Sequence, residues 1–209
     1  MTFWRYYPQP AGIGWPDTRA LGHIASRLHK LPIPSVDLPH YKPLRSLAAT
    51  LADPAARLAV TDQEHAWLTV RIDELRAAFN QLDFPLGGGL IHSDLYVGNL
   101  LWNTDGHRNS VVLGDWDSVS IGPREVDLIP TYAEPRFGTS PATVDLFARA
   151  YGYDLRLWDG YNVLLDIREL STLTALIRLA PDDVRLKDEL THRLRLLLSG
   201  NRATLWHGQ

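Results

Sequence analysis

Three polar residues in the middle of this 209-residue chain have the types and spacing that a metal-assisted reaction requires. Asp94 follows the apolar pair Leu90-Ile91, Asn99 comes five residues later, and Asp115 follows the apolar run 111–113. A carboxylate can orient a hydroxyl group and accept its proton, while an amide oxygen and a second carboxylate can hold Mg²⁺ on nucleotide phosphates. These residue types therefore favour phosphoryl transfer to a hydroxyl.

Each of these residues has a chemical interpretation and a structural alternative. We interpret Asp94 as the catalytic base, because it leaves a predicted buried strand and enters a loop that a substrate can reach. Asn99 and Asp115 are interpreted as Mg²⁺ ligands, since both are hard oxygen donors at predicted strand ends. The alternatives are a loop-capping Asp94, a turn residue at Asn99 and a strand-end cap at Asp115. Asp117 could add a second metal contact or cap the following turn.

The segment His92–Asn99, followed by Asp115-Trp116, resembles the signature of the aminoglycoside phosphotransferase and choline kinase family. The usual form in that family is His-Gly-Asp-x-x-x-x-Asn followed by Ile-Asp-Trp or Ile-Asp-Phe, and Ser93 stands here in place of the glycine. The resemblance implies a Mg²⁺- and ATP-dependent small-molecule kinase, with ATP and Mg²⁺ as cofactors. It also implies that His92 packs beneath the loop and hydrogen-bonds backbone, and that Asp127 braces the loop. A second interpretation of Asp127 is a helix N-terminal residue stabilised by the helix dipole.

The elements that must position these residues are mostly helical. Thr61 and Glu64 form a capping-box pattern that opens a long helix. Two strands, 99–103 and 110–113, are predicted to form a hairpin through Asp105-Gly106, and residues 118–123 are predicted to be a loop. Further helices are expected at 17–30, 44–52, 61–82, 125–132, 142–151, 158–179 and 181–198. The predicted fold class is α+β and mostly helical: a protein-kinase-like C-terminal lobe with a small β-hairpin core.

The N-terminal lobe of such a kinase is expected to be largely absent. Residues 1–8 are interpreted as a remnant N-lobe strand and hinge, and residues 9–209 as the catalytic and acceptor lobe. None of the three lysines (Lys30, Lys42 and Lys187) lies on a predicted strand behind a glycine loop, where a phosphate-binding lysine belongs. This chain alone could therefore lack turnover, and the alternative is a non-catalytic kinase remnant that acts as a binding or regulatory module. A metal-dependent hydrolase using Asp94, Asp115 and Asp117 would need further ligands for two metals.

The acceptor is a small molecule whose identity the sequence does not reveal, with aminoglycoside-like compounds and amino alcohols as the expected classes. A set of acidic residues could cradle a cationic amino-sugar or could form solvated helix faces. These residues are Glu134, Asp145, Asp154, Asp159, Asp166 and Glu169. A set of aromatic residues could cage a quaternary amine or pack in the core. They are Tyr151, Tyr153, Trp158 and Tyr161.

Composition places the chain among ordinary globular proteins, with 45% apolar and 22% charged residues. A net charge of −3 gives no reason to expect a nucleic-acid partner, and the absence of cysteine excludes disulfides and thiolate metal sites. The sequence has no apolar run of about 18 residues for a membrane span and no signal-peptide pattern at its start. We therefore expect a cytoplasmic protein without membrane partners. The aromatic segment 2–7 would be an exposed edge strand, which predicts self-association.

Overall fold

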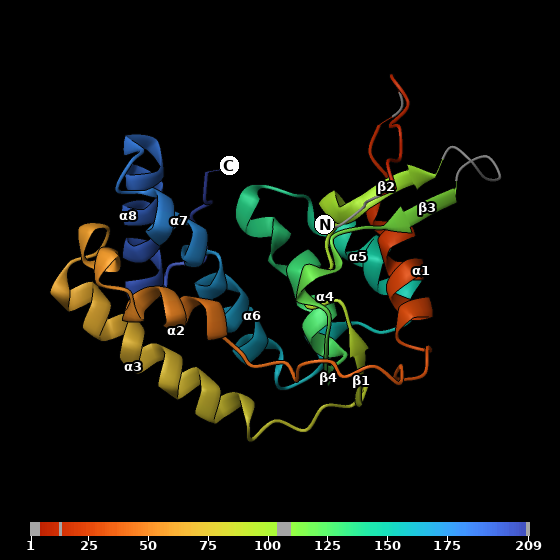
Figure 1. The fold of residues 1–209 in the computed structure, drawn as a ribbon, viewed down its shortest axis with the longest axis horizontal. Coiled ribbons are helices and arrows are strands. Elements are labelled where there is room, and N and C mark those ends of the chain that lie inside the picture. The colour runs from red at the N-terminus through yellow and green to blue at the C-terminus, as the bar shows by residue number, and fades with distance from the viewer. Residues whose placement is uncertain (1–4, 13, 104–109, 208–209) are drawn as a thin grey trace. The chain divides into compact units, whose positions relative to one another are not determined.

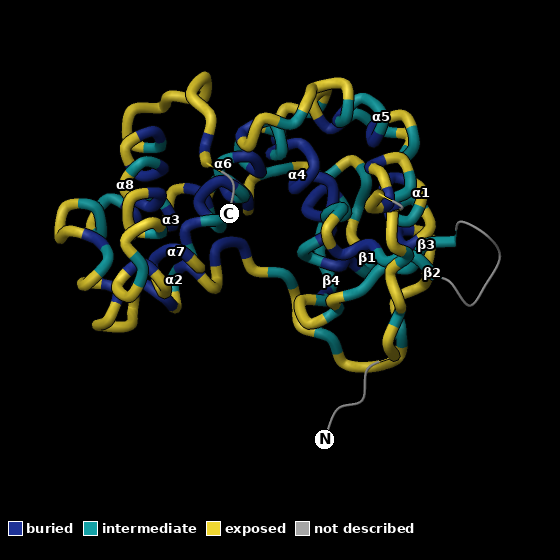
Figure 2. The backbone as a smooth tube through the Cα atoms, turned by 90° about the horizontal axis from the view of Figure 1, so that it is seen from above, coloured by how far each residue is buried: buried dark blue, intermediate teal, exposed yellow. Residues whose placement is uncertain are grey.

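The computed structural model describes residues 5–12, 14–103 and 110–207 (Figure 1). The chain divides into two compact units, each described here by itself. The first unit comprises Met1–Tyr41, Leu86–Thr131 and Pro141–Leu155, and the second comprises Lys42–Pro85, Tyr132–Ser140 and Arg156–Gln209. Helix α4 (Glu125–Ala133) begins in the first unit, and its last two residues belong to the second. All of its residues are buried, as its dark tube shows (Figure 2).

The second unit is helical. Its helices are α2 (Arg45–Ala52), α3 (Asp62–Phe79), α6 (Tyr161–Ser171), α7 (Leu173–Leu179) and α8 (Val184–Leu198). The capping box at the start of α3 is confirmed: Thr61 Oγ1 accepts from the Glu64 N–H at 3.2 Å, and the Glu64 carboxylate accepts from the Thr61 N–H at 2.8 Å. Leu68, Ile72 and Leu75 form the buried face of this helix.

The single helix predicted over 158–179 is instead two helices, α6 and α7, which meet at Thr172. Two hydroxyls at the junction bond backbone carbonyls of the preceding turn. Ser171 Oγ donates to the Ile167 carbonyl at 2.7 Å, and Thr172 Oγ1 donates to the Glu169 carbonyl at 2.7 Å. Such bonds compete with the helical ladder and bend helices, which gives a physical reason for the break.

The first unit holds two small antiparallel sheets. Strand β1 (Gly88–Ile91) pairs with β4 (Ser120–Pro123), with Leu90 opposite Ile121, and β2 (Leu100–Asn103) pairs with β3 (Ser110–Leu113), with Leu100 opposite Leu113. The hairpin prediction is confirmed in its strands, while its connection Asp105-Gly106 lies outside the described residues. The prediction of a loop throughout 118–123 was wrong, because β4 forms there. Its glycine and proline disfavour a strand locally, so pairing with β1 decides its conformation.

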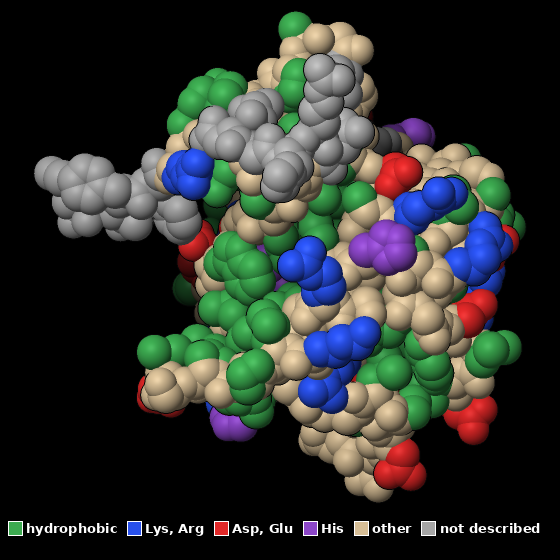
Figure 3. Space-filling model, turned by 90° about the vertical axis from the view of Figure 1, so that its right-hand side faces the viewer, with side chains coloured by type: hydrophobic (Ala, Val, Ile, Leu, Met, Phe, Trp, Pro, Cys, Tyr) green, Lys and Arg blue, Asp and Glu red, His purple; other side chains and the backbone are tan. Residues whose placement is uncertain are grey.

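Helices α1 (Thr18–Leu28) and α5 (Pro141–Tyr151) pack closely together in the first unit. Leu21, Ala25 and Leu28 line the buried face of α1, and its exposed face is basic, with Arg19 and Arg27 among its residues. Figure 3, which looks onto this side of the molecule, shows Lys and Arg side chains scattered among uncharged ones. Gly22 permits the close approach, because a Cβ there would lie 2.8 Å from the Phe147 carbonyl oxygen.

The N-terminal segment is anchored to the edge of the β2–β3 hairpin. The Gln9 side-chain amide accepts from the Trp102 N–H at 3.0 Å and donates to the Trp102 carbonyl at 3.4 Å, as a neighbouring strand would. The strand predicted at residues 2–7 is not seen at Arg5–Tyr7, and residues 1–4 lie outside the described part. The remnant-lobe role of residues 1–8 and self-association through this end stay predictions.

No helix within the described ranges is both long and apolar enough to cross a membrane.

We expect Gly22→Ala to destabilise the protein by about 1–3 kcal/mol, as overpacking of a tight interior contact does. The added Cβ would meet backbone as well as the Ala150 side chain, so the two helices would have to separate. Urea unfolding followed by circular dichroism measures the change. Gly14→Ala is the matched control, because nothing lies within 4 Å of a Cβ at that position. Equal midpoints for both variants would contradict the close packing of α1 on α5.

Candidate active site

Asp94 lies on a loop that leaves the buried end of strand β1. Ile91 and Leu95 on either side of this turn are both fully buried, while Asp94 itself is half-buried. Ser93 has a φ of 69°, in the left-handed region that favours glycine. Its hydroxyl lies 2.7 Å from that of Ser120 on β4. The position where the resembled family usually has glycine therefore does need an unusual backbone, and here a serine adopts it.

Asp127, in the first turn of α4, holds the backbone just before Asp94. Its Oδ2 accepts the His92 N–H at 2.8 Å, and its Oδ1 accepts the Ser93 N–H at 2.7 Å. The same Oδ2 lies 3.0 Å from Nε2 of His29. Asp127 is completely buried, so these donors replace the water that its charge would otherwise bind. These are the contacts that a bracing residue would make.

His92 connects the Asp94 loop to the segment that carries Asp115. Its side chain is fully buried, and its Nε2 lies 2.9 Å from the Gly114 carbonyl oxygen. A carbonyl can only accept, so Nε2 carries the proton. The imidazole ring also meets Trp116 edge to face, with ring centroids 4.8 Å apart. His92 thus joins the Asp94 loop to Gly114 and Trp116, and its structural role stays a prediction.

Asn99 links Asp94 to the β2–β3 hairpin. Its side-chain Nδ2 donates to the Asp94 carbonyl at 2.9 Å, and its backbone carbonyl accepts the Gly114 N–H at 2.8 Å. Since the amide nitrogen is fixed by that carbonyl, the amide oxygen is the atom left to face a cation. Asp115 is exposed and has a φ of 56°. The tertiary structure thus brings Asp94, Asn99 and Asp115 into one region, with Asp117 exposed nearby in the turn Trp116–Ser118.

The oxygen donors of Asn99 and Asp115 suit Mg²⁺ that is already bound to phosphate. Mg²⁺ takes one or two protein carboxylates and leaves its other positions to water and phosphate oxygens. Within the described ranges there is no group of three or more His, Asp or Glu residues suited to hold a metal by themselves.

A second buried carboxylate, Glu125, lies at the start of α4. Its Oε1 accepts the Leu86 N–H at 2.7 Å. Burial raises the pKa of Glu125, outweighing this bond and the nearby His29 and Arg124. Arg124 donates from Nε to the His29 carbonyl at 3.0 Å and from Nη1 to the Leu86 carbonyl at 2.5 Å. Strand β1 begins at Gly88, and Arg124 covers Gly89, where a Cβ would lie 2.7 Å from the guanidinium.

The sequence interpretation missed His29, Arg124 and Glu125, and it considered Tyr151 only as a cage or core aromatic, not as a partner of His29. His29 ends α1 with no local motif, and its side-chain partners lie 98 and 122 residues away in sequence. In the Glu125-Val126-Asp127 segment, the sequence pattern points to Asp127 alone. No spacing rule within the sequence would have paired these residues.

The acidic residues proposed as an acceptor cradle in the second unit are partly used in ion pairs. Asp166 pairs with Arg71 at 2.6 Å and also with Arg202. Glu169, which is 1% exposed, lies 3.2 Å from the Arg136 guanidinium, and burial raises its pKa. These two carboxylates therefore act in the packing of the second unit, which neither interpretation from the sequence described.

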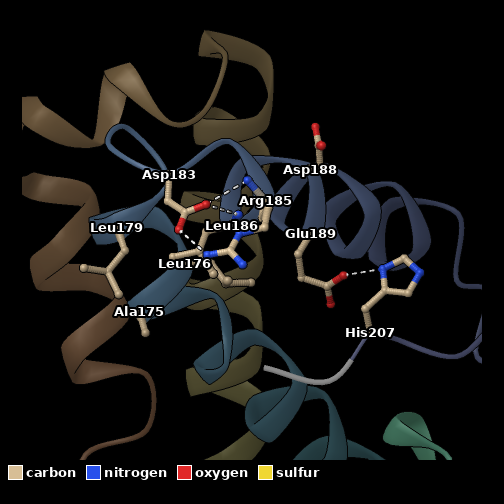
Figure 4. A pocket seen from close by; sticks show the side chains of 9 residues that line it. All are labelled: Ala175, Leu176, Leu179, Asp183, Arg185, Leu186, Asp188, Glu189 and His207. Carbon is tan, nitrogen blue, oxygen red and sulfur yellow. Dashed lines mark hydrogen bonds and ion pairs between the residues drawn. The ribbon is translucent and has the colours of Figure 1, made fainter.

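A pocket of about 540 Å³ lies between α7 and α8 in the second unit (Figure 4). Asp183 at its rim caps α8 by accepting the Arg185 N–H at 2.8 Å. Glu189 bonds Nδ1 of His207 at 2.8 Å. Asp183 and Glu189 thus have structural partners, while Asp188 also lines the pocket.

A family model described as the phosphotransferase enzyme family matches residues 17–164. The chain belongs to this phosphotransferase family. The match includes the loop of Asp94, the hairpin and Asp127. No curated protein matched the chain.

Three solved structures with a similar fold are named as kinases or as a kinase family protein. Amicoumacin kinase hAmiN, in complex with AMP-PNP, Ca²⁺ and Ami, has a TM-score of 0.63 and 15% identity over 90% of this chain and 60% of its own. A choline/ethanolamine kinase family protein from Mesorhizobium loti has a TM-score of 0.61 and 18% identity, covering 87% and 62%. A microcompartment-associated aminopropanol kinase has a TM-score of 0.60 and 17% identity, covering 89% and 63%. At these identities the likeness shows the fold alone, and this chain spans 60% of the length of the amicoumacin kinase chain.

We expect Glu125→Gln to raise the free energy of unfolding at pH 7. The glutamine keeps an oxygen to accept the Leu86 N–H but carries no charge to desolvate. Burial raises the pKa of Glu125 above its ordinary 4.5. The contribution of Glu125 to wild-type stability is therefore lost as pH rises through its folded-state pKa. The advantage of the variant should therefore shrink as pH falls toward 4.5. Urea unfolding at both pH values measures it.

Glu74→Gln serves as the control for this measurement, because Glu74 is an exposed carboxylate that pairs with Arg71 on the surface of α3. It should show no stability gain at pH 7. A Glu125→Gln variant whose advantage is independent of pH would contradict the raised pKa of Glu125.

Proposed function

We propose that this chain transfers the γ-phosphoryl group of ATP to a hydroxyl of a small molecule. The observation that carries the proposal is a pair of hydrogen bonds made by Asn99, beside Asp115. Its side chain donates to the Asp94 carbonyl, and its backbone carbonyl accepts the Gly114 N–H. They join a candidate base to two candidate oxygen ligands for Mg²⁺. Membership of the phosphotransferase family supports the reaction class.

Asp94 orients the acceptor hydroxyl and accepts its proton as the oxygen attacks the γ-phosphorus. The bond from that phosphorus to the β–γ bridging oxygen breaks, and ADP leaves. Asn99 and Asp115 would hold Mg²⁺, which would supply positive charge for the phosphate oxygens during transfer. His92 and Asp127 keep the loop in place and make no contact with substrate in this scheme.

Nucleotides in related structures support ATP as the phosphoryl donor. The amicoumacin kinase structure contains AMP-PNP and Ca²⁺, and a structure of spectinomycin phosphotransferase APH(9)-Ia contains ADP and spectinomycin, with a TM-score of 0.56 and 15% identity over 95% of this chain. We propose an aminoglycoside-like compound or an amino alcohol as the acceptor. The names of the aminopropanol and choline/ethanolamine kinases point to the amino-alcohol class.

We expect Asp115→Asn to abolish Mg²⁺-dependent ATP binding, because it removes the carboxylate among the proposed ligands. Titration calorimetry of the chain with ATP, with and without Mg²⁺, measures this. Asp37→Asn is the matched control: Asp37 is an exposed carboxylate of the same unit, and its variant should bind as wild type does. Unchanged binding by Asp115→Asn would refute the metal assignment.

We expect Asp94→Asn to bind Mg²⁺ and ATP normally but to turn over about 10²–10⁴-fold more slowly, the usual loss on removing a general base. ADP release with a panel of amino alcohols and aminoglycosides measures turnover. Full activity of the variant would exclude Asp94 as the base. A wild-type chain that binds ATP yet releases no ADP with any acceptor would favour the non-catalytic binding module instead.

A further inference from the structure

We propose that His29 is a positioning residue for the catalytic loop. It orients the carboxylate of Asp127, which in turn holds the backbone of His92 and Ser93 next to Asp94. Its effect on turnover rests on the proposed phosphotransferase function. Its effect on the loop does not, and the two can be measured separately.

The first step of the argument is that His29 and the loop share one carboxylate oxygen. Oδ2 of Asp127 lies 3.0 Å from His29 Nε2 and accepts the His92 N–H at 2.8 Å. Oδ1 accepts the Ser93 N–H at 2.7 Å. The side chains of His29 and Asp127 are 4% and 0% exposed, so water does not replace a lost donor easily. Without the imidazole, a buried carboxylate with only the two loop amides would gain freedom to rotate.

The second step is the proton arrangement within the group. Tyr151 lies with its hydroxyl 2.9 Å from His29 Nδ1. Burial raises the pKa of Tyr151, so the phenol keeps its proton and can donate it to Nδ1. An imidazole that accepts at Nδ1 carries a proton on Nε2, which here points at Asp127. Tyr151 therefore selects the tautomer in which His29 is a donor to the carboxylate.

The third step is that His29 itself has little freedom. Its N–H bonds the Ala25 carbonyl at 3.0 Å as α1 ends, and its carbonyl accepts from Arg124 Nε at 3.0 Å. Both ring nitrogens are engaged by Tyr151 and Asp127. Because hydrogen bonds hold its backbone and both ring nitrogens, His29 can fix the orientation of the Asp127 carboxylate. The packing of α1 on α5 thus determines how Asp127 presents its oxygens to the loop.

A buried polar group that only adds stability would share most of these contacts, so the test must separate positioning from stability. Two amide variants do so. His29→Gln can place a side-chain donor near the position of Nε2 and reach Asp127. His29→Asn can place its amide near the position of Nδ1 and reach Tyr151, but it is too short for Asp127.

The measurement is amide hydrogen exchange at His92 and Ser93 in the full chain, together with the free energy of unfolding from urea titration. We expect His29→Asn to speed exchange at these two amides by roughly tenfold or more, as loss of a bond to a charged group implies. His29→Gln should stay within about threefold of wild type, because a hydrogen bond to Asp127 is kept. His23→Asn, an exposed site on α1, is the control.

Kinetics provide the second readout. We expect His29→Asn to lower kcat about tenfold while KM for ATP changes less than about twofold, and His29→Gln to restore most of kcat. If the wild type shows no turnover, the proposed function fails while the exchange data still decide the role of His29. Equal exchange in the Asn and Gln variants, or a change in the Asn variant no larger than global destabilisation predicts, would overturn the proposal.

Discussion

The buried carboxylate of Asp127 is the interaction on which the candidate site depends. A charge that is removed from water must be surrounded by donors, and here the donors come from separate parts of the chain. Two are loop amides at His92 and Ser93, and the third is the ring of His29 after α1. Because the carboxylate sits in the first turn of α4, it ties β1, α1 and α4 to one point. The left-handed backbone at Ser93 is held by the same bonds.

The pairing of β2 with β3 brings together residues that lie apart in the sequence. Asn99 and Asp115 flank the two strands, and antiparallel pairing places Leu100 opposite Leu113. The Gly114 N–H then bonds the Asn99 carbonyl, and His92 bonds the Gly114 carbonyl from the other side. The hairpin and the Asp94 loop are therefore one hydrogen-bonded structure. The proposed function requires such a connection between the Asp94 loop and the segments that carry Asn99 and Asp115.

The second unit relies on buried ion pairs of a different kind. Arg136 and Glu169 are both nearly inaccessible; burial lowers the pKa of Arg136 and raises that of Glu169. Arg136 also lies over Trp206, 4.4 Å from the ring centroid, and bonds the carbonyls of Asn201 and Thr204. These contacts fasten the C-terminal segment to its unit. Such pairs are costly to break once formed, because either partner alone would be an uncompensated buried charge.

The sequence by itself determined the features that depend on residues close together along the chain. The capping box at Thr61, the strands on either side of Asp105-Gly106, and the Asp94, Asn99 and Asp115 pattern all follow from local spacing, as does most of the helical content. Only the tertiary structure decided the strand Ser120–Pro123, the break at Thr172 and the use of Asp166 and Glu169 in ion pairs. It alone also revealed His29, whose partners Asp127 and Tyr151 lie 98 and 122 residues away. Local propensity cannot encode these, because burial and pairing across such separations depend on where the whole chain has packed.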